Sequence, residues 1–165
     1  MKWRIEHGDN LEVMARMDPE SVDAIVTDPP YGLGFMGKKW DALPPGLDWA
    51  RACLRVLKPG AHMVTFGGQR TIHRLTVACE DAGFEVRDMG GWITFSGFPK
   101  SMNVSLKFDE TLGVAQGGSP VSSLAKKWAG YGTGLKPAIE PWVLLRKPLC
   151  GTVLENLEAY GTGAL

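Results

Sequence analysis

The sequence predicts an α/β domain built on a mostly parallel β-sheet, and three observations support this prediction. Short apolar runs of strand length alternate with longer segments in which apolar residues recur at helical spacing. Strand and helix patterns follow each other in turn, which is typical of chains that form a parallel sheet with crossover helices. The run VDAIVT at residues 22–27 is apolar at its centre, as interior parallel strands are.

The predicted elements follow in order from the N-terminus. Residues 3–6 form a short strand, and residues 11–17 form a helix that Asp9 or Asn10 can cap. Lys58-Pro59-Gly60 is expected to end the next helix. The other predicted strands lie at residues 22–27, 61–66, 84–86, 91–95 and 139–146, and the other predicted helices at residues 47–57, 71–82 and 153–160.

Length and composition indicate one globular domain. The chain has 165 residues, of which 44% are hydrophobic and 22% are charged, and its formal net charge is zero. No apolar run approaches the roughly 20 residues that span a bilayer, and the N-terminal segment lacks a signal-peptide core. We therefore expect a cytoplasmic protein with no membrane partner. Cys53, Cys79 and Cys150 lack metal or redox spacing, so we expect structural thiols and no metal site.

Three polar or glycine-rich turns follow predicted strands. Asp28-Pro29-Pro30-Tyr31 ends the strand at 22–27, because two adjacent prolines cannot donate ladder hydrogen bonds. Gly8-Asp9-Asn10 and Gly67-Gly68 follow two other strands. Ligands of parallel sheets bind outside the carboxyl ends of the strands, so we expect the three turns to share one rim. Each turn also has a purely structural interpretation. The turn at 28–31 could be a rigid strand-ending turn, that at 8–10 an ordinary helix cap, and that at 67–68 a tight turn.

The turn at residue 28 and several companion segments resemble the S-adenosylmethionine-dependent DNA amino-methyltransferases, the DNA methylase N-4/N-6 family. The likeness is strongest to phage and prophage members with an N-terminal catalytic region. It implies a Rossmann-like methyltransferase fold, S-adenosylmethionine as cofactor, double-stranded DNA as partner, and a bacterial or phage-infected host cell. The matching segments are GDN at 8–10, DPPYGLGFMGKKWD at 28–41, LKPG at 57–60, AGFEVRD at 82–88, W…SGFPKS at 92–101 and LKPAIEP at 135–141.

The residue types of the Asp28-Pro29-Pro30-Tyr31 turn, which we call the corner, suit methylation of an exocyclic amine, whose lone pair is delocalised into the base. An ionised Asp28 only accepts hydrogen bonds, and the Pro29 carbonyl is a second acceptor for the two N–H groups of the amine. Pro29 and Pro30 fix the backbone and so preorganise these acceptors. Tyr31 can stack on a base that has left the duplex. We predict these four residues as the catalytic set.

By the same resemblance, Gly8, Asp9 and Asn10 bind the cofactor together with Asp28, and the acid at position 9 reaches its adenosine part. DPPY favours adenine as the target, and methylation of cytosine N4 or of RNA remains an alternative. The residues predicted to contact DNA phosphates, each of which has solvated surface as its alternative, are Lys38, Lys39, Lys100 and Ser101.

The family's FxGxG and HPTxKP segments do not occur in this sequence. We therefore expect a partial catalytic domain over residues 1–165, with an incomplete sheet whose exposed edge pairs with a second chain or copy. A catalytically inactive fragment or DNA-binding module is the alternative. Residues 113–134 are predicted as a glycine-rich loop or insertion that could face the substrate through Lys126, Lys127, Trp128 and Tyr131.

Overall fold

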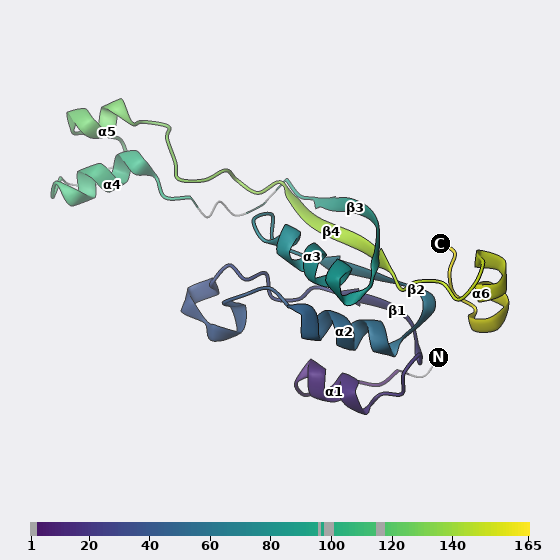
Figure 1. Cartoon of the computed structure of the whole chain (residues 1–165). Coiled ribbons are helices and arrows are strands. Elements are labelled where there is room, and N and C mark those ends of the chain that lie inside the picture. Colours follow the sequence, from purple (N-terminus) through teal and green to yellow (C-terminus); the bar gives the residue numbers. More distant parts are fainter. Residues whose placement is uncertain (1–2, 96, 98–100, 115–117) are drawn as a thin grey trace. The chain divides into compact units, whose positions relative to one another are not determined.

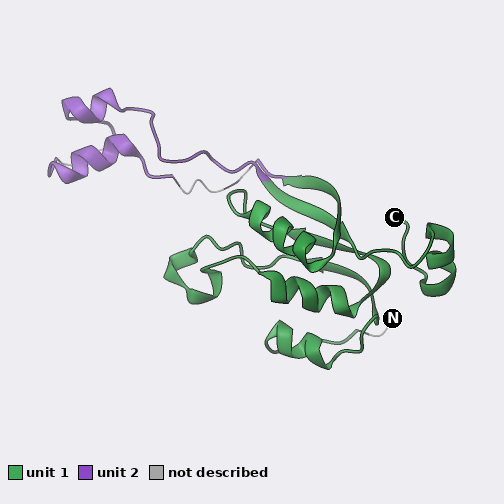
Figure 2. Ribbon diagram, viewed as in Figure 1, with its two compact units in different colours: residues 1–92, 140–165 green, residues 93–139 purple. Residues whose placement is uncertain are grey.

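The computed structural model describes residues 3–95, 97, 101–114 and 118–165 (Figure 1). The chain forms two compact units (Figure 2). Unit 1 comprises residues 1–92 and 140–165, and unit 2 comprises residues 93–139. The elements are α1 (Asn10–Arg16), β1 (Val22–Thr27), η1 (Phe35–Gly37), η2 (Lys39–Asp41), α2 (Leu47–Val56), β2 (Leu57–Phe66), α3 (Ile72–Ala82), β3 (Glu85–Ile93), α4 (Val104–Thr111), α5 (Ser123–Lys127), β4 (Ile139–Arg146) and α6 (Val153–Tyr160).

The four strands form one mixed sheet in the order β1-β2-β4-β3. β1 and β2 are parallel, and β4 is antiparallel to β2, with Phe66 opposite Trp142 and His62 opposite Arg146. The predicted α/β class is confirmed, but the sheet is less parallel than predicted. The reason lies in the connection. The chain enters β4 beside the C-terminal end of β2, so β4 must run back along β2. A parallel strand would need a crossover that brings the chain to the N-terminal end of β2.

Three local predictions differ from the structure. The two short strands predicted at 84–86 and 91–95 are one strand, β3. Residues 3–6 are not a strand, because they pair with no neighbour among the described residues and leave Trp3 and Ile5 largely exposed. Lys58-Pro59-Gly60 does not end a helix. α2 ends at Val56, and these residues belong to the first part of β2. Val22 of β1 pairs with Leu57, but Ala24 pairs with His62, so the register between the two strands shifts. The Lys58-Pro59-Gly60 segment therefore belongs to a bulge in β2.

The hydrophobic core of unit 1 lies between the sheet and two helices. Figure 1 shows α2 and α3 side by side, and α1 contacts α2. Apolar residues at helical spacing on α2 and α3 meet alternate residues of β2 and β4, which gives the core one continuous layer. The fully or nearly buried members are Trp49, Ala50, Cys53, Leu57, Ala61, Met63, Ile72, Leu75, Cys79, Phe84, Val143 and Leu145.

The opposite face of the sheet is less well covered. The alternate residues His62, Val64 and Phe66 of β2 are only partly buried, and 77% of Val26 on β1 is exposed. β1 is also an edge strand, because it pairs with β2 alone. Within the described part of the chain, one face and one edge of the sheet therefore carry apolar groups that lack a packing layer.

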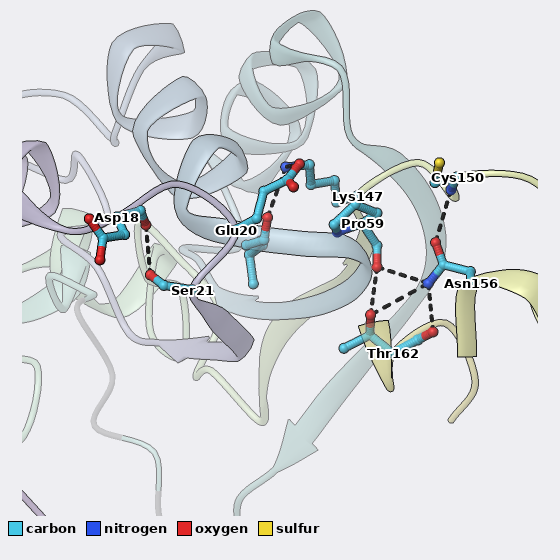
Figure 3. Close-up of polar contacts among 9 residues, drawn as sticks. Asp18, Glu20, Ser21, Pro59, Lys147, Cys150, Asn156 and Thr162 are labelled. Atoms are coloured by element: carbon cyan, nitrogen blue, oxygen red, sulfur yellow. Dashed lines mark hydrogen bonds and ion pairs between the residues drawn. The ribbon is translucent and has the colours of Figure 1, made fainter. Parts of the chain in front are cut away.

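A buried amide joins the C-terminal segment to the sheet (Figure 3). The side chain of Asn156 on α6 donates to the Pro59 and Thr162 carbonyls at 2.9 and 2.7 Å and accepts from the Cys150 N–H at 2.9 Å. The Thr162 hydroxyl also donates to the Pro59 carbonyl at 2.5 Å. Gly60 has φ +74°, and a Cβ there would lie 2.5 Å from Nδ2 of Asn156. The bulge in β2 therefore provides the acceptor that anchors α6.

Unit 2 contains a pair of short helices. α4 contacts α5, and the buried Ser105 donates its hydroxyl to the Ala125 carbonyl at 2.8 Å. The buried Asp109 of α4 accepts from the Val121 and Ser122 N–H groups at 2.8 and 3.0 Å. α5 thus lies inside the segment 113–134 that the sequence predicted as a loop or insertion, of which residues 115–117 fall outside the described residues.

Candidate catalytic site

The Asp28-Pro29-Pro30-Tyr31 corner follows β1 directly, at the carboxyl edge of the sheet. Pro29 is buried and Asp28 is exposed, so the backbone is held while the carboxylate faces outward. The hydroxyl of the half-buried Tyr31 lies near the Asp28 carboxylate, to which it can donate. Burial, together with this carboxylate, raises the pKa of Tyr31 well above its usual value, so its hydroxyl stays protonated and keeps donating.

The turn between β2 and α3 holds Tyr31 from the other side. The Thr71 hydroxyl donates to the Tyr31 carbonyl at 2.5 Å. A Cβ at Gly68 would lie 3.1 Å from Cβ of Tyr31, so the absence of a side chain lets the two backbones approach. Gly67 is equally restricted, because its Cβ would lie 2.5 Å from Cδ1 of Ile72. The structure therefore brings the Gly67-Gly68 turn against the predicted catalytic corner.

A cavity of about 380 Å³ lies beside the corner. Asn10 at the start of α1 and Pro30 both line it, so it connects a predicted cofactor-binding residue with a predicted catalytic one. Its other walls include the indole rings of Trp40 and Trp49 and the carboxylate-bearing Asp48 at the start of α2. Apolar walls with a few polar groups and a volume of several hundred Å³ are typical of small-molecule sites.

Gly8-Asp9-Asn10 forms the N-terminus of α1. The Asp9 carboxylate accepts from the Leu11 and Glu12 N–H groups at 2.9 and 3.4 Å, which makes it the cap of this helix. The structural alternative, an ordinary cap, is therefore observed. The predicted contact with the cofactor stays a prediction, since a carboxylate has lone pairs beyond those that the cap uses.

The loop after the corner is organised by one buried carboxylate. Asp41 is only 4% exposed and accepts from the Gly32, Leu33 and Phe35 N–H groups at 2.8, 3.2 and 2.8 Å. These hydrogen bonds, that from Phe35 above all, hold the pKa of the Asp41 carboxyl below its usual value. Gly32 has φ +67°, and a Cβ there would meet Pro44 at 2.4 Å, so the loop also needs glycine at its start.

We expect Asp41→Ala to loosen this loop, because three backbone donors lose their acceptor. Limited proteolysis should cut between residues 32 and 45 about tenfold faster, while the core of unit 1 stays folded. Since the pKa of Asp41 is depressed in the folded chain, its contribution is complete above the usual Asp value of about 3.9 and is lost as pH falls below it. Asp81→Ala removes an exposed carboxylate of α3 and serves as the control. Equal cleavage of both variants would contradict this role.

The predicted DNA-contacting residues fall in different places. Lys38 and Lys39 lie in the Asp41-organised loop and are exposed. Ser101 lies in unit 2, where its hydroxyl accepts from the Gly134 N–H at 3.1 Å, and Lys100 lies outside the described residues. Their contact with DNA stays a prediction.

Three further residues contribute to the corner and were not singled out from the sequence. Thr71 holds the Tyr31 backbone and Asp41 holds the following loop. Glu140 at the start of β4 is close enough to raise the pKa of Tyr31 further. Asp41 ends the DPPYGLGFMGKKWD segment and Glu140 lies in LKPAIEP, so both stood in quoted motifs, whereas nothing in the sequence marks Thr71.

Other chemistries find less support here. Cys53 and Cys79 belong to the core, and burial raises the pKa of both thiols to about 12, so they are poor nucleophiles at neutral pH. Among the residues that the structure describes, no group of three or more His, Cys, Asp or Glu side chains has metal-binding geometry. The same residues contain no helix long and apolar enough to cross a bilayer.

Comparison with known proteins also points to DNA methylases. A family model described as DNA methylase matches residues 22–116. The Type II methyltransferase M.HindIII of Haemophilus influenzae is 23% identical over 206 residues, which cover 97% of this chain and 63% of M.HindIII. The chain thus spans less than two thirds of this relative.

Two solved structures share the fold. The M1.HpyAVI–SAM complex has a TM-score of 0.52 at 21% identity, over 91% of this chain and 56% of that one. The cytosine-N4-specific PvuII DNA methyltransferase has a TM-score of 0.50 at 18% identity, over 96% of this chain and 54% of that one. These likenesses confirm the predicted Rossmann-like methyltransferase fold.

Proposed function

We propose that this chain, which belongs to the DNA methylase family, carries the catalytic corner of an enzyme that methylates the exocyclic amino nitrogen of a flipped adenine in double-stranded DNA. One observation supports this above all. The exposed Asp28 stands at the end of β1 on a proline-fixed backbone, with the hydroxyl of Tyr31 near its carboxylate and the backbone of Tyr31 held by Thr71.

The residues of the corner act on the amine. The Asp28 carboxylate and the Pro29 carbonyl accept hydrogen bonds from the two N–H groups of the amine. These bonds draw the nitrogen toward tetrahedral geometry and make its lone pair available. Asp28 can do so while it accepts from Tyr31, because a carboxylate offers about four lone-pair sites. The ring of Tyr31 stacks on the base, and stacking worth about 1–3 kcal/mol offsets part of the cost of base flipping.

The cavity beside the corner fits S-adenosylmethionine as the cofactor. It has the volume of a small-molecule site, and it joins Asn10 to Pro30 between apolar indole walls. Of the residues predicted to bind the cofactor, Asn10 lines this cavity, whereas Gly8, Asp9 and Asp28 do not line it and would reach the cofactor from the neighbouring turns. When bound, it supplies a methyl group already activated on a sulfonium, so the chemistry needs no metal and no covalent adduct with a cysteine.

Three other functions are candidates. Cytosine N4 presents the same kind of amine to the same acceptors, and the PvuII enzyme, which shares this fold, is specific for it; an amine in RNA is a further possibility. An inactive fragment or DNA-binding module is the third candidate. With each of these functions, we propose the cytoplasm of a bacterial or phage-infected cell as the location.

The uncovered sheet supports a further part of the proposal. The edge of β1 and the exposed Val26 beside it provide unpaired backbone groups and apolar surface. A strand from a second chain, or from a second copy of this one, would pair with β1 and complete the sheet. Light scattering would then report a mass above that of the 17.9 kDa monomer.

Calorimetric titration of S-adenosylmethionine into the purified chain tests the proposal, followed by transfer of a labelled methyl group to polynucleotides. We expect binding with a dissociation constant of about 1 μM, corresponding to about 8 kcal/mol, and label in adenine of duplex DNA. Label in cytosine, or in RNA, would show that the methylated amine is that one and not adenine in DNA. Binding without transfer to any polynucleotide would overturn the catalytic proposal, and DNA binding without cofactor binding would establish the inactive module.

A further inference from the structure

Positive charge is concentrated in unit 2. This unit contains five lysines and only two acidic residues, so its net charge is +3, although the whole chain is neutral. Unit 1 carries the balancing charge of −3. An asymmetry of this kind between two parts of a chain indicates a polyanionic partner for the basic part.

The two acids of unit 2 do little to offset this charge at the surface. Asp109 is 1% exposed, and hydrogen bonds from Ser122 and Val121 keep its pKa low and its carboxylate occupied. Glu110 is exposed and forms an ion pair with Lys107 at 2.9 Å. Within the part of the chain that the structure describes, neither Lys126 nor Lys127 takes part in an ion pair, although Lys126 is near enough to Asp109 for its charge to help lower the pKa of that carboxyl.

These two lysines stand beside two exposed aromatic rings. Trp128 and Tyr131 pack edge to face with their centroids 5.3 Å apart, and Nζ of Lys127 lies 5.8 Å from the Trp128 ring. Tyr131 is 61% exposed and Trp128 is 36% exposed. We call Lys126, Lys127, Trp128 and Tyr131 the α5 cluster. Adjacent cations and aromatic rings are what nucleic-acid surfaces combine, because the cations meet phosphates and the rings meet bases or sugars.

The α5 cluster is held in place at both ends. On one side, Ser122 caps α5 and is itself bonded to Asp109, and Ser105 fixes the Ala125 carbonyl. On the other side, the Val104 N–H donates to the Tyr131 carbonyl at 3.2 Å. A bridge between Asn103 and Gly132 continues this pairing. A fixed surface loses less conformational entropy on binding than a flexible loop would.

We propose that the α5 cluster is a docking surface for the phosphate backbone of duplex DNA, with Lys126 and Lys127 each neutralising one phosphate. The proposal rests on the proposed function, because it assigns to unit 2 the task of holding the DNA whose base is methylated. It adds a set of contacts separate from Lys38, Lys39, Lys100 and Ser101.

The test measures duplex DNA binding by the full chain, as fluorescence anisotropy over a range of salt concentrations. Each phosphate contact contributes about 0.9 to the slope of log K against log salt. The Lys126→Gln/Lys127→Gln variant should therefore lose about 1.8 from this slope and bind about tenfold or more weakly at low salt. Lys126→Arg/Lys127→Arg keeps both charges and should retain the wild-type slope.

Lys107→Gln is the matched control, because Lys107 lies in the same unit but is already paired with Glu110. It should leave the slope unchanged. An unchanged slope in the Lys126→Gln/Lys127→Gln variant would overturn the inference, and so would a stronger dependence on these lysines with duplex RNA than with DNA. Methyl transfer by the wild-type chain is scored separately. A failure of methyl transfer would count against the proposed function, while the salt slope still decides the docking surface.

Discussion

Asp28→Asn should reduce methyl transfer by about 10³-fold or more at saturating DNA and cofactor, while the fold is kept. Asparagine has the shape of aspartate, and its amide oxygen can still accept from the Tyr31 hydroxyl. It replaces one acceptor oxygen by a donor NH₂ group, which faces the amine of the base with N–H against N–H. The loss should fall mainly on kcat, because the acceptors act most strongly as positive charge develops on the nitrogen.

Tyr31→Phe is the control for this variant. It keeps the ring that stacks on the base and removes only the hydroxyl that donates to Asp28. We expect a loss of about tenfold to a hundredfold, the size of one hydrogen bond to a charged group. Single-turnover transfer of labelled methyl to duplex DNA measures both variants, with circular dichroism as the check on folding. Asp28→Asn with activity near that of the wild type would remove Asp28 from the mechanism.

Much of the corner could be predicted from the sequence, because its information is local. Two adjacent prolines end a strand wherever they occur, and an acid and an aromatic beside them are placed by the same turn. The strand at Val22–Thr27 has the predicted bounds. The helices at 47–57, 71–82 and 153–160 were predicted within one residue at each end, because each combines an apolar periodicity with a stop or cap residue.

What could not be predicted depends on residues distant in the sequence. Thr71 reaches Tyr31 only because β2 lies beside β1, and a lone threonine carries no sign of that contact. The direction of β4 depends on where the intervening unit 2 returns the chain. The charge of unit 2 was hidden in a neutral total, and it became visible only when the unit's boundaries were known.

Lys58-Pro59-Gly60 illustrates the same limit at one turn. Proline and glycine after an amphipathic helix are a sound stop signal, and α2 does end close by, at Val56. Gly60 is nevertheless required for another reason. Its φ of +74° allows the bulge in β2, and the space of a side chain there is taken by Nδ2 of Asn156 and by Leu149. The packing of the C-terminal segment thus determines the role of a glycine about one hundred residues earlier in the chain.

Asn156→Leu should destabilise the chain by about 3 kcal/mol, because it removes the amide and leaves its partners buried. Asn156 is fully buried, and it serves the carbonyls of Pro59 and Thr162 and the N–H of Cys150 at once. The Thr162 hydroxyl still serves Pro59 in the variant, so the cost comes chiefly from the Thr162 carbonyl and the Cys150 N–H. For a chain of this size the melting temperature should fall by about 10 °C.

Leu154→Asn in the same helix is the matched control, because it makes the reverse exchange at a position that is 78% exposed. It should change the melting temperature by no more than a few degrees, since an exposed amide is satisfied by water and loses only some helix propensity, about 0.5 kcal/mol. Thermal unfolding followed by circular dichroism compares the two. If Asn156→Leu melted with the control, the buried amide would not be what anchors α6, and the positive φ of Gly60 would serve the bulge in β2 alone.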